Sequence, residues 1–170
     1  MPNVKLSTGV DLYYESHGQG EPLIFVPSTA YSGEVWKPSQ LPLAASLNII
    51  FHDPRGCGRS VATQSVYTIE QMALDILGLM DHLKLSSAHL IGHSMGGRIA
   101  LSLAENFPGR VKSLIMAASG SGPAARPGSD CIPGLPHRLV LDMVQMGFEK
   151  FIYDEIVESD TFFTRDYRER

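Results

Sequence analysis

The feature that most constrains this chain is a serine flanked by glycines, in the stretch Gly92-His93-Ser94-Met95-Gly96-Gly97. A short apolar run, 88–91, precedes this stretch, and a helical pattern follows it. A serine hydroxyl is a weak nucleophile, so an enzyme that uses one exposes it on a sharp turn, within reach of a base and of backbone N–H groups. Glycine on each side leaves room for such a turn. The stretch therefore predicts a serine presented between a strand and a helix.

Buried strands and amphipathic helices alternate on both sides of this turn. Alternating apolar residues around Thr8-Gly9 predict an N-terminal hairpin. Two mainly apolar runs, 22–26 and 48–52, are typical of strands covered on both faces of a sheet, and 111–117 is again strand-like. Apolar residues three or four apart predict helices from 69 to 83, capped by Thr68 and Gln71, and from 99 to 107. The alternation predicts an α/β fold, with a mostly parallel sheet, helices on both faces, and sites at the carboxyl ends of the strands.

Composition narrows the range of partners. The chain has 18 acidic and 14 basic residues, a formal net charge of -4 and no long basic run, so we expect no nucleic-acid partner. It has neither a leader-like apolar segment nor a run that could span a bilayer, so we expect a cytoplasmic protein without a membrane partner. Cys57 and Cys131 fit neither a disulfide framework nor a metal site. We therefore expect free thiols, no metal and no cofactor.

Two motifs in this order resemble the α/β-hydrolase superfamily. The stretch 92–97 looks like its nucleophile elbow. The segment Asp53-Pro54-Arg55-Gly56-Cys57-Gly58-Arg59-Ser60 resembles the Asp-x-Arg-Gly-x-Gly-x-Ser loop that follows the fourth strand in many members. Together with 67–73, the run 90–97 is most similar to small esterases, enol-lactonases and C–C hydrolases. The resemblance implies the fold of this superfamily, incomplete at the C-terminus because its last core strands have no counterpart here.

The resemblance also divides the chain into three parts. Residues 1–118 correspond to the N-terminal part of the hydrolase core. Residues 119–136 are rich in glycine, serine and proline and predict a linker. Residues 137–170 then correspond to the start of a helical lid.

The resemblance implies a role for each candidate site residue. Ser94 would attack an acyl carbon, and the backbone N–H of Met95 would form half of the oxyanion hole. Thr29 matches the second oxyanion donor, because this chain has Pro27-Ser28 where many relatives have His-Gly. Three further residues are expected to line the substrate pocket: Ser28, Trp36 and His93. Tyr31 and Met95 are further candidates for this pocket, and both of them, like Trp36, could equally belong to the core.

The acid and the base of a catalytic triad are not identifiable in this chain. In the superfamily they follow the serine, on loops after two later strands. His137 is the only histidine after Ser94, and it falls in the predicted lid. The resemblance therefore implies the N-terminal portion of a longer hydrolase, with its acid and histidine outside this sequence or on another chain. The missing strands would also leave an unpaired sheet edge, so we expect self-association or a partner chain.

Three functions are compatible with these observations. The first is a serine hydrolase that cleaves a carboxylic ester, lactone or related small acyl substrate through an acyl-enzyme at Ser94. The second keeps the fold and changes the reaction: a cofactor-free perhydrolase, an aminopeptidase or a C–C hydrolase. The third is a non-catalytic, truncated or pseudo-enzyme module, because no activating base is identifiable.

Four other polar residues have structural interpretations. His52 and His89 lie in predicted strands and are interpreted as core histidines with satisfied hydrogen bonds. Asp53 and Arg55 are predicted to fix their loop by hydrogen bonds to each other and to the main chain.

Overall fold

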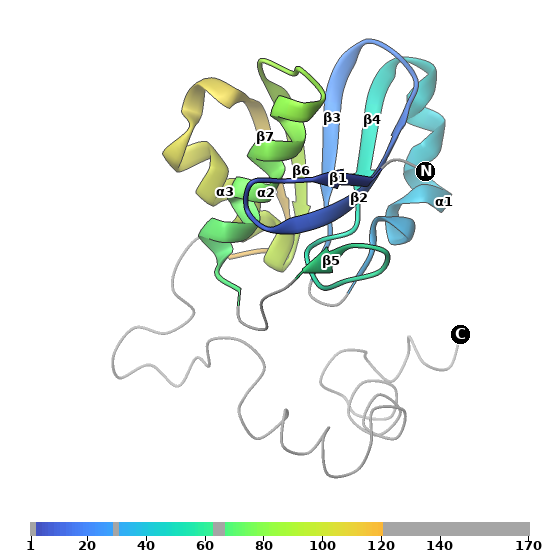
Figure 1. Cartoon of the computed structure of the whole chain (residues 1–170). Helices are drawn as coiled ribbons and strands as arrows, with labels where there is room; N and C mark the ends of the chain where they lie inside the picture. The colour runs from blue at the N-terminus through green and yellow to red at the C-terminus, as the bar shows by residue number, and fades with distance from the viewer. Residues whose placement is uncertain (1–2, 29–30, 63–66, 121–170) are drawn as a thin grey trace, which may run out of the picture. The chain divides into compact units, whose positions relative to one another are not determined.

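The sheet is mixed, and its parallel half carries the candidate site. The computed structural model describes residues 3–28, 31–62 and 67–120, which contain seven strands (Figure 1). The strands are β1 (Asn3–Lys5), β2 (Val10–His17), β3 (Glu21–Val26), β4 (Leu47–His52), β5 (Val61–Ala62), β6 (Ala88–His93) and β7 (Val111–Ala117). Their order is β1-β2-β4-β3-β6-β7, with β5 paired to β2. The predicted N-terminal hairpin is confirmed, because β1 and β2 pair antiparallel.

The order of the strands places the candidate site at the centre of the sheet. β2 runs antiparallel to β4, whereas β4, β3, β6 and β7 are mutually parallel. The chain passes from β3 to β4 on one side and then to β6 on the other, so the direction of winding reverses at β3. Ligands of open α/β sheets bind at such a reversal, outside the carboxyl ends of the strands. The predicted α/β fold is therefore confirmed.

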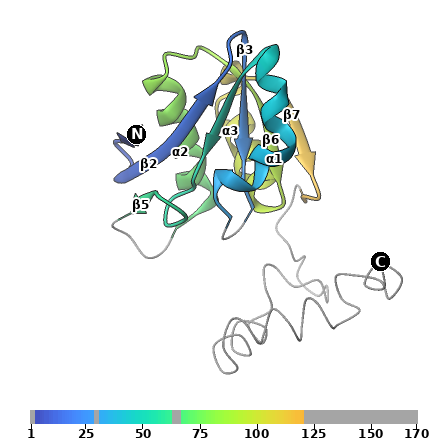
Figure 2. The same cartoon turned by 90° about the vertical axis from the view of Figure 1, so that its right-hand side faces the viewer.

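Helices cover both faces of this sheet (Figures 1 and 2). On one face lie α2 (Ile69–His82) and α3 (Met95–Asn106), and α2 begins with the predicted capping box of Thr68 and Gln71. On the other face lie the 3-10 helix η1 (Gly33–Trp36), α1 (Lys37–Gln40) and the 3-10 helix η2 (Leu41–Ala45). A third 3-10 helix, η3 (Pro108–Arg110), leads into β7.

Each face of the sheet has its own apolar core. The larger core joins α2 and α3 to the sheet and contains, among others, Ile24, Leu90, Ile76 and Leu103, all essentially inaccessible to solvent. The smaller core lies under η1 and consists of Leu23, Phe25, Ile49 and Phe51, with Trp36 packed against it. Burial on both faces explains why β3 and β4 are continuous apolar runs.

The strand β7 forms one edge of the described part of the sheet. Its only partner among the described strands is β6. Ile115, in the middle of β7, is 55% exposed. The predicted lid and all of the predicted linker except Ser119 and Gly120 lie outside the described residues. Within the described residues, no helix has the length and hydropathy needed to cross a membrane.

Candidate active site

Ser94 occupies a strained turn between β6 and α3. Its backbone has φ 52° and ψ -117°, a conformation that is costly for a residue with a Cβ and that persists only where the surroundings enforce it. The turn is held by the end of β7, because the Ser94 N–H donates to the Ala117 carbonyl over 2.9 Å. The Ser119 hydroxyl in turn donates to the Ser94 carbonyl over 2.7 Å.

The three glycines around Ser94 have no room for a Cβ, because main-chain atoms or the Ser119 side chain lie too close. A Cβ on Gly92 would lie 2.3 Å from the Gly96 carbonyl oxygen, and one on Gly96 would lie 2.1 Å from that of Val26. A Cβ on Gly97 would lie 2.4 Å from the Ser119 hydroxyl. The glycines therefore allow α3 to begin directly after β6, and they allow the turn to pack closely against the end of β3.

A pocket of about 350 Å³ lies beside this turn. Its lining residues come from the segment after β3 and from the end of β6: Ser28, Tyr31, Val35, Trp36, Ser39 and His93. The Trp36 ring packs 5.1 Å from the Phe25 ring and 6.3 Å from the His93 ring, centroid to centroid. The structure thus brings together the three predicted pocket residues, whereas the predicted oxyanion residue Thr29 lies outside the described residues.

Two pocket residues, Val35 and Ser39, were not predicted from the sequence, whereas Tyr31 was a candidate and lines the pocket. Val35 and Ser39 are four residues apart, which is the spacing that places side chains on one face of a helix. That spacing was a usable signal, because residues 33–45 are helical in the structure.

The described residues do not supply a base for Ser94. Their histidines have other neighbours: His17 bonds to Glu15, His82 to Tyr14 and His89 to Ser113. His93 packs against Trp36, and His137 lies outside the described residues. The described chain likewise contains no group of three His, Cys, Asp or Glu side chains that could hold a metal ion.

The interpretation of the two strand histidines needs correction. His52 is buried, but neither of its ring nitrogens has a hydrogen-bond partner among the described residues. Burial lowers the pKa of His52 to about 4, because the charged ring would lose its hydration. His89 is partly exposed rather than in the core, and its Nδ1 lies 2.7 Å from the Ser113 hydroxyl.

The predicted bond between Asp53 and Arg55 is also wrong, because each has another partner. Asp53 binds Arg59, whose Nε lies 2.9 Å from Asp53 Oδ2. Arg55 instead makes a bidentate pair with Asp75 of α2, over 2.7 and 2.6 Å. Burial alone would raise the pKa of Asp53, but hydrogen bonds from Arg59 and Gly33 outweigh it and hold that pKa below its usual value.

Fold and site together define a protein with a serine on a strained strand-to-helix turn of a mostly parallel α/β sheet. A family model for the alpha/beta hydrolase fold matches residues 21–160, and the chain belongs to this family. Two curated relatives are both named "Putative carbamate hydrolase RutD". The protein from Caulobacter sp. (strain K31) is 36% identical over 117 residues, which are 66% of this chain and 44% of the relative. The protein from Variovorax paradoxus is 38% identical over 119 residues, 67% of this chain and 44% of the relative.

Solved structures show the same fold. Est816, described as an N-acyl homoserine lactone degrading enzyme, aligns with a TM-score of 0.76 at 30% identity, over 92% of this chain and 56% of its own. A thermophilic esterase from Thermogutta terrifontis aligns with a TM-score of 0.76 at 29% identity, over 93% of this chain and 58% of its own. This chain therefore spans under half the length of the two curated relatives and little more than half of these solved chains.

Proposed function

We propose that this protein is a serine hydrolase that cleaves a carboxylic ester, lactone or related acyl substrate through an acyl-enzyme at Ser94. The observation that carries the proposal is the strained backbone of Ser94, in a turn so closely packed that the three neighbouring glycines have no room for a Cβ. Backbone strain of this kind is retained where it serves a function. Here the strained turn presents a serine at the carboxyl end of β6.

The proposed reaction has two steps. The Ser94 hydroxyl attacks the acyl carbon, its proton passes to a base outside the described residues, and the alcohol leaves. Water then cleaves the acyl-enzyme and releases the acid. Met95 is the first residue of α3, where backbone N–H groups point out of the helix end, so we assign its N–H to the developing oxyanion, with Thr29 as the second donor.

The pocket and the relatives support an acyl substrate. Apolar side chains of Val35 and Trp36 form part of the pocket wall, and polar groups of Ser28 and His93 lie in the same pocket. An apolar wall with a few polar groups is typical of sites for small organic molecules. The relatives are named as a putative carbamate hydrolase, an N-acyl homoserine lactone degrading enzyme and a thermophilic esterase, and these names support a carbonyl-containing substrate.

Covalent labelling tests the proposal directly. Protein expressed from its complete gene is treated with a fluorophosphonate, which loses fluoride as a serine oxygen binds phosphorus, and the adduct is located by mass spectrometry. We expect one adduct at Ser94 and none in Ser94→Ala. Ser113→Ala is the matched control, because Ser113 has a histidine at 2.7 Å but lies on the extended strand β7. An unlabelled Ser94 in folded protein, or labelling of Ser113 instead, contradicts the proposal.

We also propose that the outer edge of β7 pairs with β7 of a second copy of the chain 1–170. The support is an edge without a partner among the described strands and an exposed Ile115 at its centre. Sedimentation of this chain should show a dimer, and Ile115→Lys should shift it toward monomer because like charges would face each other. A monomer at every concentration for the unaltered chain contradicts this.

A further inference from the structure

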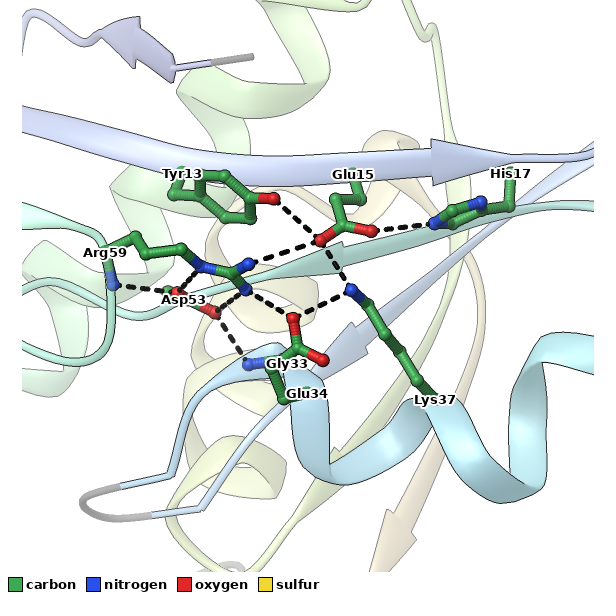
Figure 3. Close-up of polar contacts among 8 residues, drawn as sticks. All are labelled: Tyr13, Glu15, His17, Gly33, Glu34, Lys37, Asp53 and Arg59. Atoms are coloured by element: carbon green, nitrogen blue, oxygen red, sulfur yellow. Dashed lines mark hydrogen bonds and ion pairs between the residues drawn. The ribbon is translucent and has the colours of Figure 1, made fainter. Parts of the chain in front are cut away.

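The carboxylate of Asp53 joins two loops at the carboxyl end of the sheet (Figure 3). Asp53 follows β4 directly and is fully buried. Its Oδ1 accepts the backbone N–H of Gly33 over 2.9 Å, from the first residue of η1. Its Oδ2 accepts both the backbone N–H and the Nε of Arg59, each over 2.9 Å. One carboxylate therefore binds the segment after β3 and the loop after β4 at the same time.

Two glycines make this close approach possible. Gly58 has φ +52°, and a Cβ there would lie 2.3 Å from Asp53 Oδ2. A Cβ on Gly33 would lie 2.8 Å from the His52 carbonyl oxygen. Gly58 therefore leaves room for the Asp53 carboxylate, and Gly33 leaves room for the backbone at the end of β4.

Arg59 extends the connection along η1. Its guanidinium binds Asp53 and also lies 2.9 Å from the Glu34 carboxylate. The same guanidinium stacks 3.6 Å above the Tyr13 ring, which fixes its plane. Glu34 also accepts from Lys37, 2.8 Å away, and Lys37 donates to Glu15 on β2. Figure 3 shows these side chains converging between β2 and η1.

None of these charged residues lines the pocket. The lining residues of η1 are Val35 and Trp36, which follow Gly33 and Glu34 directly. The backbone of η1 is therefore held by charges on one side while its apolar side chains face the pocket and the smaller core.

We propose that Asp53 and Arg59 are positioning residues that hold η1 in place and thereby set the Trp36 wall of the substrate pocket. The inference rests on the proposed function for its biological meaning, because the pocket is assigned there to the acyl substrate. Neither residue touches the reacting atoms. Their loss loosens the pocket wall, so it raises KM for an acyl substrate more than it lowers kcat.

Trp36 provides a direct measurement, because it is the only tryptophan in the chain. Quenching of its fluorescence by acrylamide, a neutral quencher, reports how accessible the pocket wall is, without any need for catalysis. We expect the quenching constant to rise about twofold or more in Asp53→Asn, because hydrogen bonds to a charged acceptor are stronger than those to a neutral one. Arg59→Gln should show a smaller rise in the same direction.

The matched controls remove an ion pair elsewhere. Arg110 binds Asp81 over 2.6 Å, away from η1, so Asp81→Asn and Arg110→Gln should leave the quenching constant unchanged. Unfolding midpoints identify variants that are folded. Arg59→Gln decides the question if Asp53→Asn does not fold, since Arg59 is 39% exposed and its replacement leaves the core intact. A folded Arg59→Gln whose Trp36 quenching equals that of the unaltered protein overturns the inference.

The quenching experiment can fail or succeed independently of the labelling experiment that tests the proposed function. Fluorophosphonate labelling reports on Ser94, whereas quenching reports on Trp36, so failure to label does not change the quenching result. In a labelled, active protein, the KM for 4-nitrophenyl butyrate should rise in Arg59→Gln while the rate of labelling at saturating fluorophosphonate stays the same. An unchanged KM also overturns the inference.

Discussion

Two arginines of the loop after β4 each pair with an aspartate, and the two pairs differ in what surrounds them. Arg55 and Asp75 are both almost completely buried, and their bidentate bond ties the loop to α2. Asp53 is equally buried, but its partner Arg59 is 39% exposed and reaches over the segment that lines the pocket. The same residue types therefore have different roles. The buried pair Arg55–Asp75, here called the closed pair, stabilises the core. The partly exposed pair Asp53–Arg59, here called the open pair, connects the core to the segment that lines the pocket.

The closed pair gives the largest expected effect. Replacing Arg55 with methionine leaves the Asp75 carboxylate buried without its cation, which typically costs about 3–5 kcal/mol. Urea unfolding of Arg55→Met measures this loss. The double variant Arg55→Met/Asp75→Leu should recover most of it, because an apolar pair carries no desolvation penalty. A loss below about 1 kcal/mol in the single variant would show that the pair is not closed to water.

The pH dependence of stability that His52 contributes shows whether water reaches the interior around Arg55 and Asp75. His52 shares a cavity of about 10 Å³ with Arg55 and Asp75, among other residues. Its pKa is about 4 in the folded protein against a usual 6.5, so the unfolded chain binds a proton first as the pH falls. Stability from this group is complete above pH 6.5 and falls between pH 6.5 and 4, by about 3 kcal/mol.

Unfolding of His52→Gln against the unaltered protein, at pH 7 and pH 4.5, isolates that contribution. The variant should lose less stability on acidification than the unaltered protein. Equal acid sensitivity of His52→Gln and the unaltered protein would mean that His52 is hydrated.

The open pair should contribute least to stability. Arg59→Gln is expected to cost about 1 kcal/mol or less, because solvent screens a partly exposed ion pair and two backbone N–H groups still bind Asp53. The comparison with Arg55→Met is made in the same urea titration. If Arg59→Gln lowered the free energy of unfolding about as much as Arg55→Met does, Arg59 would act as a core residue rather than as a partly exposed one.

Local signals predicted the elements well. The run 111–117 is β7 to the residue, and 22–26 and 48–52 each miss one residue of β3 and β4. The helix predicted from 99 begins at Met95, because Gly96 and Gly97 carry no apolar side chain that could show the periodicity. The pocket was predicted in part, since Ser28, Tyr31, Trp36 and His93 were candidates from the sequence, whereas Val35 and Ser39 were not.

The sequence by itself determined most of the strands and the capped helix α2, because each depends on neighbours within a few residues. It also marked the glycine-framed turn at Ser94, although contacts with Val26, Ala117 and Ser119 hold that turn in its strained form. Only the tertiary structure decided which charges meet. Asp53 binds Gly33 because β3 and β4 lie side by side in the sheet, and Arg55 binds Asp75 because α2 packs across the same sheet. Ion pairs form between residues that the fold brings together, so the spacing of charged residues along the chain does not predict which of them will pair.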